Sequence, residues 1–178
     1  MKDAMTESPF RWTKQHELQS KGWELLTEKR LVEAEKILLS ALEAEDDNPV
    51  DRHFVYNKLI ELYYKLRDER EDALGRCIFF CEKDIDSLPE FFRVWKIQYP
   101  PIPDLSEEMS LPQCPSIERL AIIYEMKMEY QKAIDLCKYA IDLGLEATWD
   151  SYNQRYGTNK GFKARIQKLE KKRERAKK

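Results

Sequence analysis

Long apolar segments are missing from this sequence. No run of apolar residues is longer than Leu120–Tyr124, whereas a membrane-spanning helix needs roughly 18 such residues or more. The N-terminal sequence MKDAMTESPF lacks the apolar core of a secretory signal. Four cysteines in 178 residues do not form a disulfide scaffold, which favours a reducing compartment. We therefore expect a cytoplasmic protein that does not associate with membranes.

Glycine is scarce, because the chain contains only five, while Glu, Lys, Leu and Ala are frequent. This composition favours helix throughout. Hydrophobic residues make up 42% of the chain, which supports a folded core. A chain of this length buries roughly two-thirds of its unfolded surface, so a single domain needs no covalent staples. The expected fold class is all-α.

Recognisable catalytic and metal-binding patterns are also missing. His16 and His53 have no nucleophile or acid at a motif spacing. Cys77 and Cys81 share a helical face, but no CxxC pair or histidine cluster accompanies them. The glycines of 157–161 lack the Gly-Lys-Ser/Thr ending of a phosphate-binding loop. We therefore predict no enzymatic activity, no cofactor and no metal site.

The formal net charge of −2 conceals a marked asymmetry. Residues 160–178 carry ten Lys or Arg and two Glu, a net +8, which leaves −10 on residues 1–159. One interpretation is an ordinary helix end, since cations are favoured near a helix C-terminus. A second interpretation is contact with an acidic protein partner. A third is contact with the phosphates of a nucleic acid. In that case we expect no recognition of the bases, because Phe162 is the one aromatic residue of the tail. The candidate anion contacts are Lys168, Lys171, Lys172, Arg173 and Arg175.

The clearest pattern is Ser116–Gly144, which reads as two amphipathic helices folded against each other. Its first half has apolar residues at i, i+3, i+4 and i+7, and its second half resumes the rule after a polar break. Gly144 is expected to follow the end of the second helix. Two further pairs of amphipathic segments precede this one, and Pro49 in AEDDNP separates them. The sequence thus predicts three helical hairpins.

Aligning Ala34, Ala73 and Ala133 places the three hairpins in one register. Nine positions before each alanine lies an apolar or aromatic residue: Leu25, Tyr64 and Tyr124. Four positions after each alanine lies a residue suited to the core: Leu38, Cys77 and Cys137. Gly22 and Ala121 occupy a small position in this register. The pattern resembles the tetratricopeptide repeat, with three degenerate copies. The resemblance implies an α-solenoid of about three hairpins over residues 11–159.

The remaining segments flank or interrupt this array. Residues 1–10 are expected to be flexible, and 160–178 to form a basic helix that closes the C-terminal end. Residues 86–115 form an insertion between the second and third hairpins and hold six of the eight prolines. In it, Ser87 and Glu90 predict the start of a short helix. Its aromatic residues either pack between the hairpins or contact a partner: Phe91, Trp95 and Tyr99.

Tetratricopeptide-like arrays bind proteins or peptides, and the first helices of their hairpins line a concave groove. In this sequence the resemblance places eight residues there: Gln19, Trp23, Lys58, Leu62, Lys65, Glu118, Ile122 and Glu125. The family's clamp for a C-terminal carboxylate is not supported, because Glu118 and Glu125 oppose the two lysines. The expected function is non-catalytic protein–protein interaction. Two alternatives remain: a regulator that contacts nucleic acid through the basic tail, and a peptide-sensing regulator.

Overall fold

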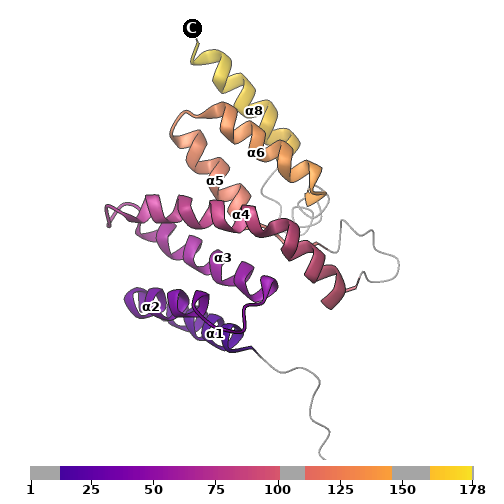
Figure 1. Ribbon diagram of the computed structural model, residues 1–178. Helices are drawn as coiled ribbons and strands as arrows, with labels where there is room; N and C mark the ends of the chain where they lie inside the picture. Colours follow the sequence, from indigo (N-terminus) through magenta and orange to yellow (C-terminus); the bar gives the residue numbers. More distant parts are fainter. Residues whose placement is uncertain (1–12, 101–110, 146–160, 178) are drawn as a thin grey trace, which may run out of the picture.

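The computed structural model describes residues 13–100, 111–145 and 161–177, and every regular element in these ranges is an α-helix (Figure 1). The all-α prediction is therefore confirmed for this part of the chain. The helices are α1 (Lys14–Thr27), α2 (Leu31–Leu42), α3 (Pro49–Leu66), α4 (Ala73–Gln98), α5 (Pro115–Met126), α6 (Tyr130–Asp142) and α8 (Gly161–Arg175). The predicted N-terminal segment 1–10 and part of the insertion lie outside the described residues.

Consecutive helices pack in pairs, α1 with α2, α3 with α4 and α5 with α6. The three pairs are stacked in chain order, and α8 lies beyond the third pair against α6 (Figure 1). Helix α3 contacts both helices of the first pair, and α5 contacts both helices of the second. Each pair therefore buries apolar surface between its own helices, and the second and third pairs also bury apolar surface against the pair before them.

The turns inside the first and third pairs have the same backbone geometry. Lys29 and Met128, each five residues before an aligned alanine, have φ angles of 62° and 59°. The residue after each donates its N–H to the carbonyl five positions earlier, at 2.9 and 2.8 Å. This is the hydrogen bond that ends many helices through a left-handed residue. Gly144, with a φ of 81°, follows the end of α6 as the sequence predicts.

Small residues allow the helices to approach each other closely. Ala34, Ala73 and Ala133 are all fully buried. At Gly22 on α1 an added Cβ would lie 2.5 Å from Cδ2 of Leu38 on α2. Since Leu38 is itself fully buried, its side chain fills the space that the missing Cβ leaves. The contact between α1 and α2 thus depends on glycine at this position.

Two apolar clusters form the core. The first lies among α1, α2, α3, α5 and the N-terminal half of α4, and the second joins the C-terminal half of α4 to the start of α3 and to α5, α6 and α8. Ile85, Tyr124 and Leu136 pack against both clusters, so the apolar interior is continuous from the first pair to α8. This continuity couples the folding of the hairpins, as in other stacked helical units.

Helix α4 corrects one sequence prediction, because no new helix begins at Ser87. The helix runs unbroken for 26 residues with Pro89 inside it, and the Ser87 hydroxyl donates to the Asp84 carbonyl at 2.8 Å. A proline inside a helix costs about 3 kcal/mol. Burying Leu88 and Phe91 completely contributes roughly 1.5–3 kcal/mol for each side chain, which offsets that cost.

A buried polar pair fixes the C-terminal half of α4 to α3. His53 and Asp84 are fully buried, and His53 Nδ1 lies 2.7 Å from Asp84 Oδ1. Asn57 Nδ2 lies 3.0 Å from the other ring nitrogen, and the ring of Phe91 stacks on the imidazole at 4.0 Å. Buried polar groups are tolerated when they are hydrogen-bonded in this way. The pair therefore determines where α4 lies relative to α3.

Glu35 on α2 connects the first and second pairs through hydrogen bonds. Its carboxylate accepts from the Tyr63 hydroxyl at 2.6 Å and from two nitrogens of Arg70 at 2.6 and 2.9 Å. The bonds from Arg70 hold the pKa of Glu35 below its ordinary value although burial opposes this. Burial, together with Glu35, raises the pKa of Tyr63 to about 12. The carboxylate is thus ionised and bonded at neutral pH.

We expect Gly22→Ala to lower the free energy of unfolding by about 1–3 kcal/mol, because the new methyl group overlaps the buried Leu38 side chain. Gly75→Ala is the matched control, since a Cβ there meets nothing within 4 Å. That change on α4 should stabilise the chain by about 0.5–1 kcal/mol through helix propensity. Urea unfolding measures both variants. Effects of the same sign would contradict the close approach of α1 and α2.

Candidate partner-binding face

The first helices of the three pairs, together with α8, present a row of mostly polar and aromatic side chains, several of which contact one another. We call this row the first-helix face. Its members are Gln19 and Trp23 on α1, Lys58, Glu61, Tyr64 and Lys65 on α3, Glu118, Arg119, Ile122 and Glu125 on α5, and Arg165, Lys168 and Lys172 on α8.

Trp23 and Lys58 connect α1 to α3 on this face. Trp23 is 46% exposed, and the Lys58 ammonium lies 3.4 Å from the centroid of its indole ring. Glu61 is shared by two lysines, with oxygen–nitrogen distances of 3.9 Å to Lys58 and 2.8 Å to Lys65. Burial lowers the pKa of Lys58, although the charge of Glu61 opposes this. The positive charge of Lys58 is therefore only partly compensated by Glu61, and a carboxylate of a partner could compensate the remainder.

Tyr64 lies at the junction of α3 and α5, between two guanidinium groups. The Arg119 guanidinium carbon lies 3.7 Å from the ring centroid and that of Arg67 lies 4.2 Å from it. Arg67 also donates to the Tyr64 carbonyl at 2.7 Å. These stacking contacts hold Arg119 on the surface between the second and third pairs.

Glu125 on α5 receives three cations from α8. Its carboxylate oxygens lie 2.9 Å from Arg165, 2.6 Å from Lys172 and 3.5 Å from Lys168. The Glu125 side chain is 12% exposed. Burial raises the pKa of Glu125, but the hydrogen bond from Lys172 and the charges of the three cations outweigh it, so the pKa lies below its ordinary value. The three cations recur at i, i+3 and i+7, which places them on one side of α8.

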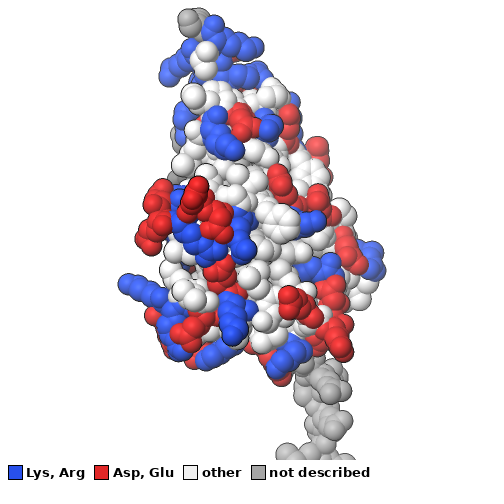
Figure 2. Space-filling view, turned by 60° about the vertical axis from the view of Figure 1, so that its left-hand side comes forward, with Lys and Arg blue, Asp and Glu red and all other residues white. Residues whose placement is uncertain are grey.

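The structure thus brings together two sets of residues that the sequence treats separately. Glu125 was predicted in the groove, whereas Lys168 and Lys172 were predicted as anion contacts of an independent tail. Arg173 also turns to the array, because it donates to the Gln131 side chain of α6. Lys171 and Arg175 are exposed. Figure 2 shows Lys and Arg gathered at the end of the molecule where α8 lies, whereas both signs are interspersed over the hairpins.

Two candidate contact residues, Leu62 and Phe91, are fully buried, so neither is accessible to a partner in this conformation. Leu62 is fully buried in the first apolar cluster, because α3 packs against helices of both neighbouring pairs and buries more than one side. Phe91 is fully buried against His53. Trp95 is half-buried with Tyr99 at a ring distance of 4.3 Å, and Tyr99 remains 43% exposed. Packing of α4 against α3 therefore accounts for the burial of Phe91.

The remaining predicted groove residues are accessible. Gln19, Glu118 and Ile122 are half-buried, and Lys65 is exposed. Burial raises the pKa of Glu118, which the charges of Arg165 and Arg119 oppose. The charges of both guanidinium groups therefore act on the Glu118 carboxyl group.

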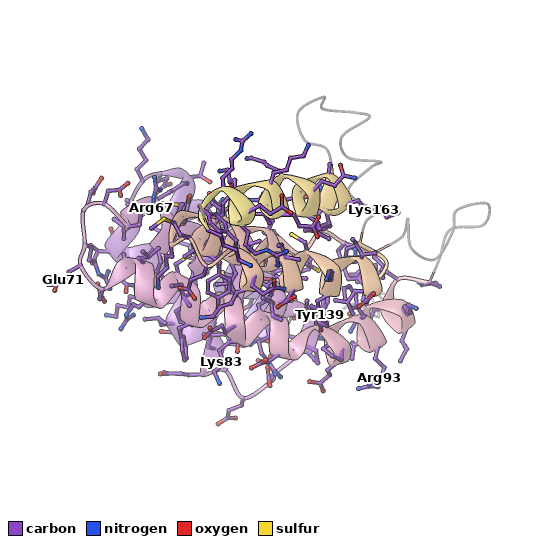
Figure 3. The ribbon with its side chains drawn as sticks, turned by 90° about the horizontal axis from the view of Figure 1, so that it is seen from above. Arg67, Glu71, Lys83, Arg93, Tyr139 and Lys163 are labelled. Atoms are coloured by element: carbon purple, nitrogen blue, oxygen red, sulfur yellow. The ribbon has the colours of Figure 1, made fainter. Side chains whose placement is uncertain are left out.

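A second surface feature is a cleft of about 400 Å³ between α4 and the third pair. It is lined by Ile85, Tyr124, Lys132, Asp135, Leu136 and Tyr139. Seen from above, Tyr139 lies along one side of the molecule with Lys83 and Arg93, whereas Arg67 and Lys163 lie along the other (Figure 3). Sequence reasoning missed this cleft because it arises where α4 meets α5 and α6, and no local pattern marks it.

Three general findings frame the site. Among the described residues, no cluster of His, Cys, Asp or Glu is arranged to hold a metal ion. In the same ranges, no helix is both long and apolar enough to cross a membrane. Comparison with protein-family models, curated proteins and solved structures gave no match to this chain. The proposals below therefore rest on the residues and geometry described above.

We expect Glu125→Gln to lower the free energy of unfolding at neutral pH by about 1–2 kcal/mol, because the amide no longer attracts three cations. A folded-state pKa below 4.5 means that this stabilisation is complete above that pH and is lost as the pH falls through the folded-state value. The wild-type chain should therefore approach the variant in acid. Urea unfolding at a series of pH values measures the difference.

Glu129→Gln serves as the control for this prediction. Glu129 also pairs with a lysine, Lys132, but its side chain is 28% exposed, against 12% for Glu125, and the lysine is exposed, so the change should have little effect on unfolding. If the two variants lose the same stability, or if the loss at Glu125 does not depend on pH, the docking of α8 through Glu125 is wrong.

Proposed function

We propose that the chain is a tetratricopeptide-like helical array that acts as a non-catalytic protein–protein interaction module, located in the cytoplasm. Three degenerate repeats are supported by full burial of the aligned alanines and by matched turn geometry in the first and third pairs. The positions four residues after each alanine, Leu38, Cys77 and Cys137, are also fully buried. In such an array the first helices bind the partner.

The observation that carries the functional proposal is the contact row of the first-helix face. Trp23, Lys58 and Glu61 are linked on α1 and α3, Tyr64 and Arg119 are linked on α3 and α5, and the row continues to α8 through Glu125. Tryptophan, tyrosine and arginine are the residue types enriched at protein interfaces. A face that combines them over four helices suits a protein partner better than a small molecule.

The alternative of nucleic-acid binding through the tail has one observation in its favour, the excess of Lys and Arg on α8. However, Arg165, Lys168 and Lys172 are directed to the Glu125 carboxylate, and Arg173 bonds to α6. These four cations of α8 therefore contact α5 or α6. We keep protein binding as the main proposal.

The test is affinity capture from nuclease-treated lysate with the intact chain and two variants. The face variant is Trp23→Ala/Ile122→Glu, which changes two accessible positions on α1 and α5. The control is Val32→Ala/Phe79→Ala, which removes exposed apolar side chains from α2 and α4, with residue exposures of 81% and 49%. We expect a partner retained by the wild type and the control to be lost with the face variant.

Circular dichroism and thermal unfolding verify that both variants are folded as well as the wild type. Capture of the same proteins by all three baits would contradict the proposal, and so would selective loss with the α2 and α4 control. In either case the cleft beside Tyr139 would become the better candidate surface.

A further inference from the structure

The cations of the first-helix face outnumber its carboxylates. Six cations lie on it: Lys58, Lys65, Arg119, Arg165, Lys168 and Lys172. Three carboxylates accompany them: Glu61, Glu118 and Glu125. The face therefore has a net charge of +3 although residues 1–159 carry −10. This reverses the view from the sequence, in which Glu118 and Glu125 cancel the two lysines of α3.

The excess is concentrated in two clusters, each with one carboxylate at its centre. Glu61 serves Lys58 and Lys65, and Glu125 serves three cations of α8. One carboxylate can neutralise only one of the cations around it. Each cluster thus retains positive charge that further carboxylates can compensate. Because Lys58 is partly buried, water screens its attraction to such a carboxylate less than at an exposed site.

We propose that the partner bound by the first-helix face is an acidic protein segment, with carboxylates placed at the α3 cluster and at the α8 cluster. This inference rests on the proposed function and specifies the chemistry of the partner. Complementary charge increases the rate of association and selects against basic competitors. The half-buried Ile122 lies on α5 between the clusters and can take an apolar side chain of the segment.

The geometry favours an acidic protein over a nucleic acid for two reasons. Single strands bind by stacking bases on exposed aromatic rings. On this face the Lys58 ammonium lies against the ring of Trp23, and the guanidinium groups of Arg67 and Arg119 lie against the ring of Tyr64, so a stacking base would have to displace a cation. In addition, Glu61 and Glu125 at the cluster centres would repel a continuous row of phosphates, whereas spaced carboxylates of a protein can avoid them.

The test measures fluorescence anisotropy with three labelled probes and the intact chain. The first is an amphipathic peptide of about 20 residues, roughly 30 Å long as a helix, with glutamate across its polar face. The second replaces every glutamate with glutamine, and the third is a thymidine oligonucleotide of similar length. We expect the glutamate peptide to bind at least about tenfold more tightly than either of the others, with an affinity that falls as salt increases.

A matched pair of variants locates the binding. Lys65→Gln/Lys168→Gln/Lys172→Gln removes three accessible cations from the face, and Lys36→Gln/Lys83→Gln/Lys138→Gln removes three exposed cations from α2, α4 and α6. The net charge changes equally. We expect the first set to weaken peptide binding by about tenfold or more and the second to change it less than about twofold. Thermal unfolding verifies that both triple variants remain folded.

Equal losses in the two variants would overturn the inference, since attraction would then follow net charge alone. Failure of the glutamate peptide to bind, or tighter binding of the oligonucleotide, would overturn it as well. These results differ from failure of the proposed function. A captured partner that needs Trp23 and Ile122 but is indifferent to the three lysines would retain the interaction module and reject its acidic ligand.

Discussion

The carboxylate of Glu125 is the point on which the C-terminal part of the molecule depends. A carboxylate that is largely removed from solvent requires compensation, and three cations of α8 supply it. The same helix buries Phe162 and Leu169 in the second apolar cluster. Charge pairing with α5 on one side and apolar burial on another thus fix α8 against the third pair.

This arrangement makes α8 part of the candidate binding surface and not an appendage. Without it, α5 would present Glu118 and Glu125 to a partner, and the third pair would be an acidic end of the face. With it, Arg165, Lys168 and Lys172 lie beside these carboxylates and change the sign of the local charge. The chain therefore positions its basic C-terminal segment by means of its own acidic residues.

Local patterns predicted much of the fold. Apolar periodicity located the helices, and Gly144 follows α6 in the left-handed conformation as expected. These features depend on residues a few positions apart. The predicted start of a helix at Ser87 was wrong because the decisive interaction, burial of Phe91 against His53, joins residues distant in sequence.

The candidate site was predicted less completely for the same reason. A first-helix register identified Trp23 and Lys58, which the structure places in contact. It could not show that Leu62 is buried, because the width of the buried arc on α3 depends on two neighbouring pairs. Nor could it connect Glu125 to residues forty or more positions later on α8. Sequence separation conceals contacts of this kind until the chain is folded.

The pair His53 and Asp84 illustrates a related limit. Each residue alone reads as a polar position on an amphipathic helix, yet both are fully buried and bonded to each other. Removing one partner would leave the other polar group buried without compensation, which is far costlier than losing a surface pair. The pair therefore favours one placement of the extended α4 and keeps its apolar end over the second cluster.

Hydroxyl-radical footprinting of the chain with and without its captured partner tests the central claim most directly. Trp23 on the first-helix face and Phe79 on α4 are similarly exposed, at 46% and 49%, and both are readily oxidised. The account predicts that partner binding protects Trp23 while Phe79 reacts as before. Protection of Phe79 with unchanged oxidation of Trp23 would show that the partner binds elsewhere and would contradict the account.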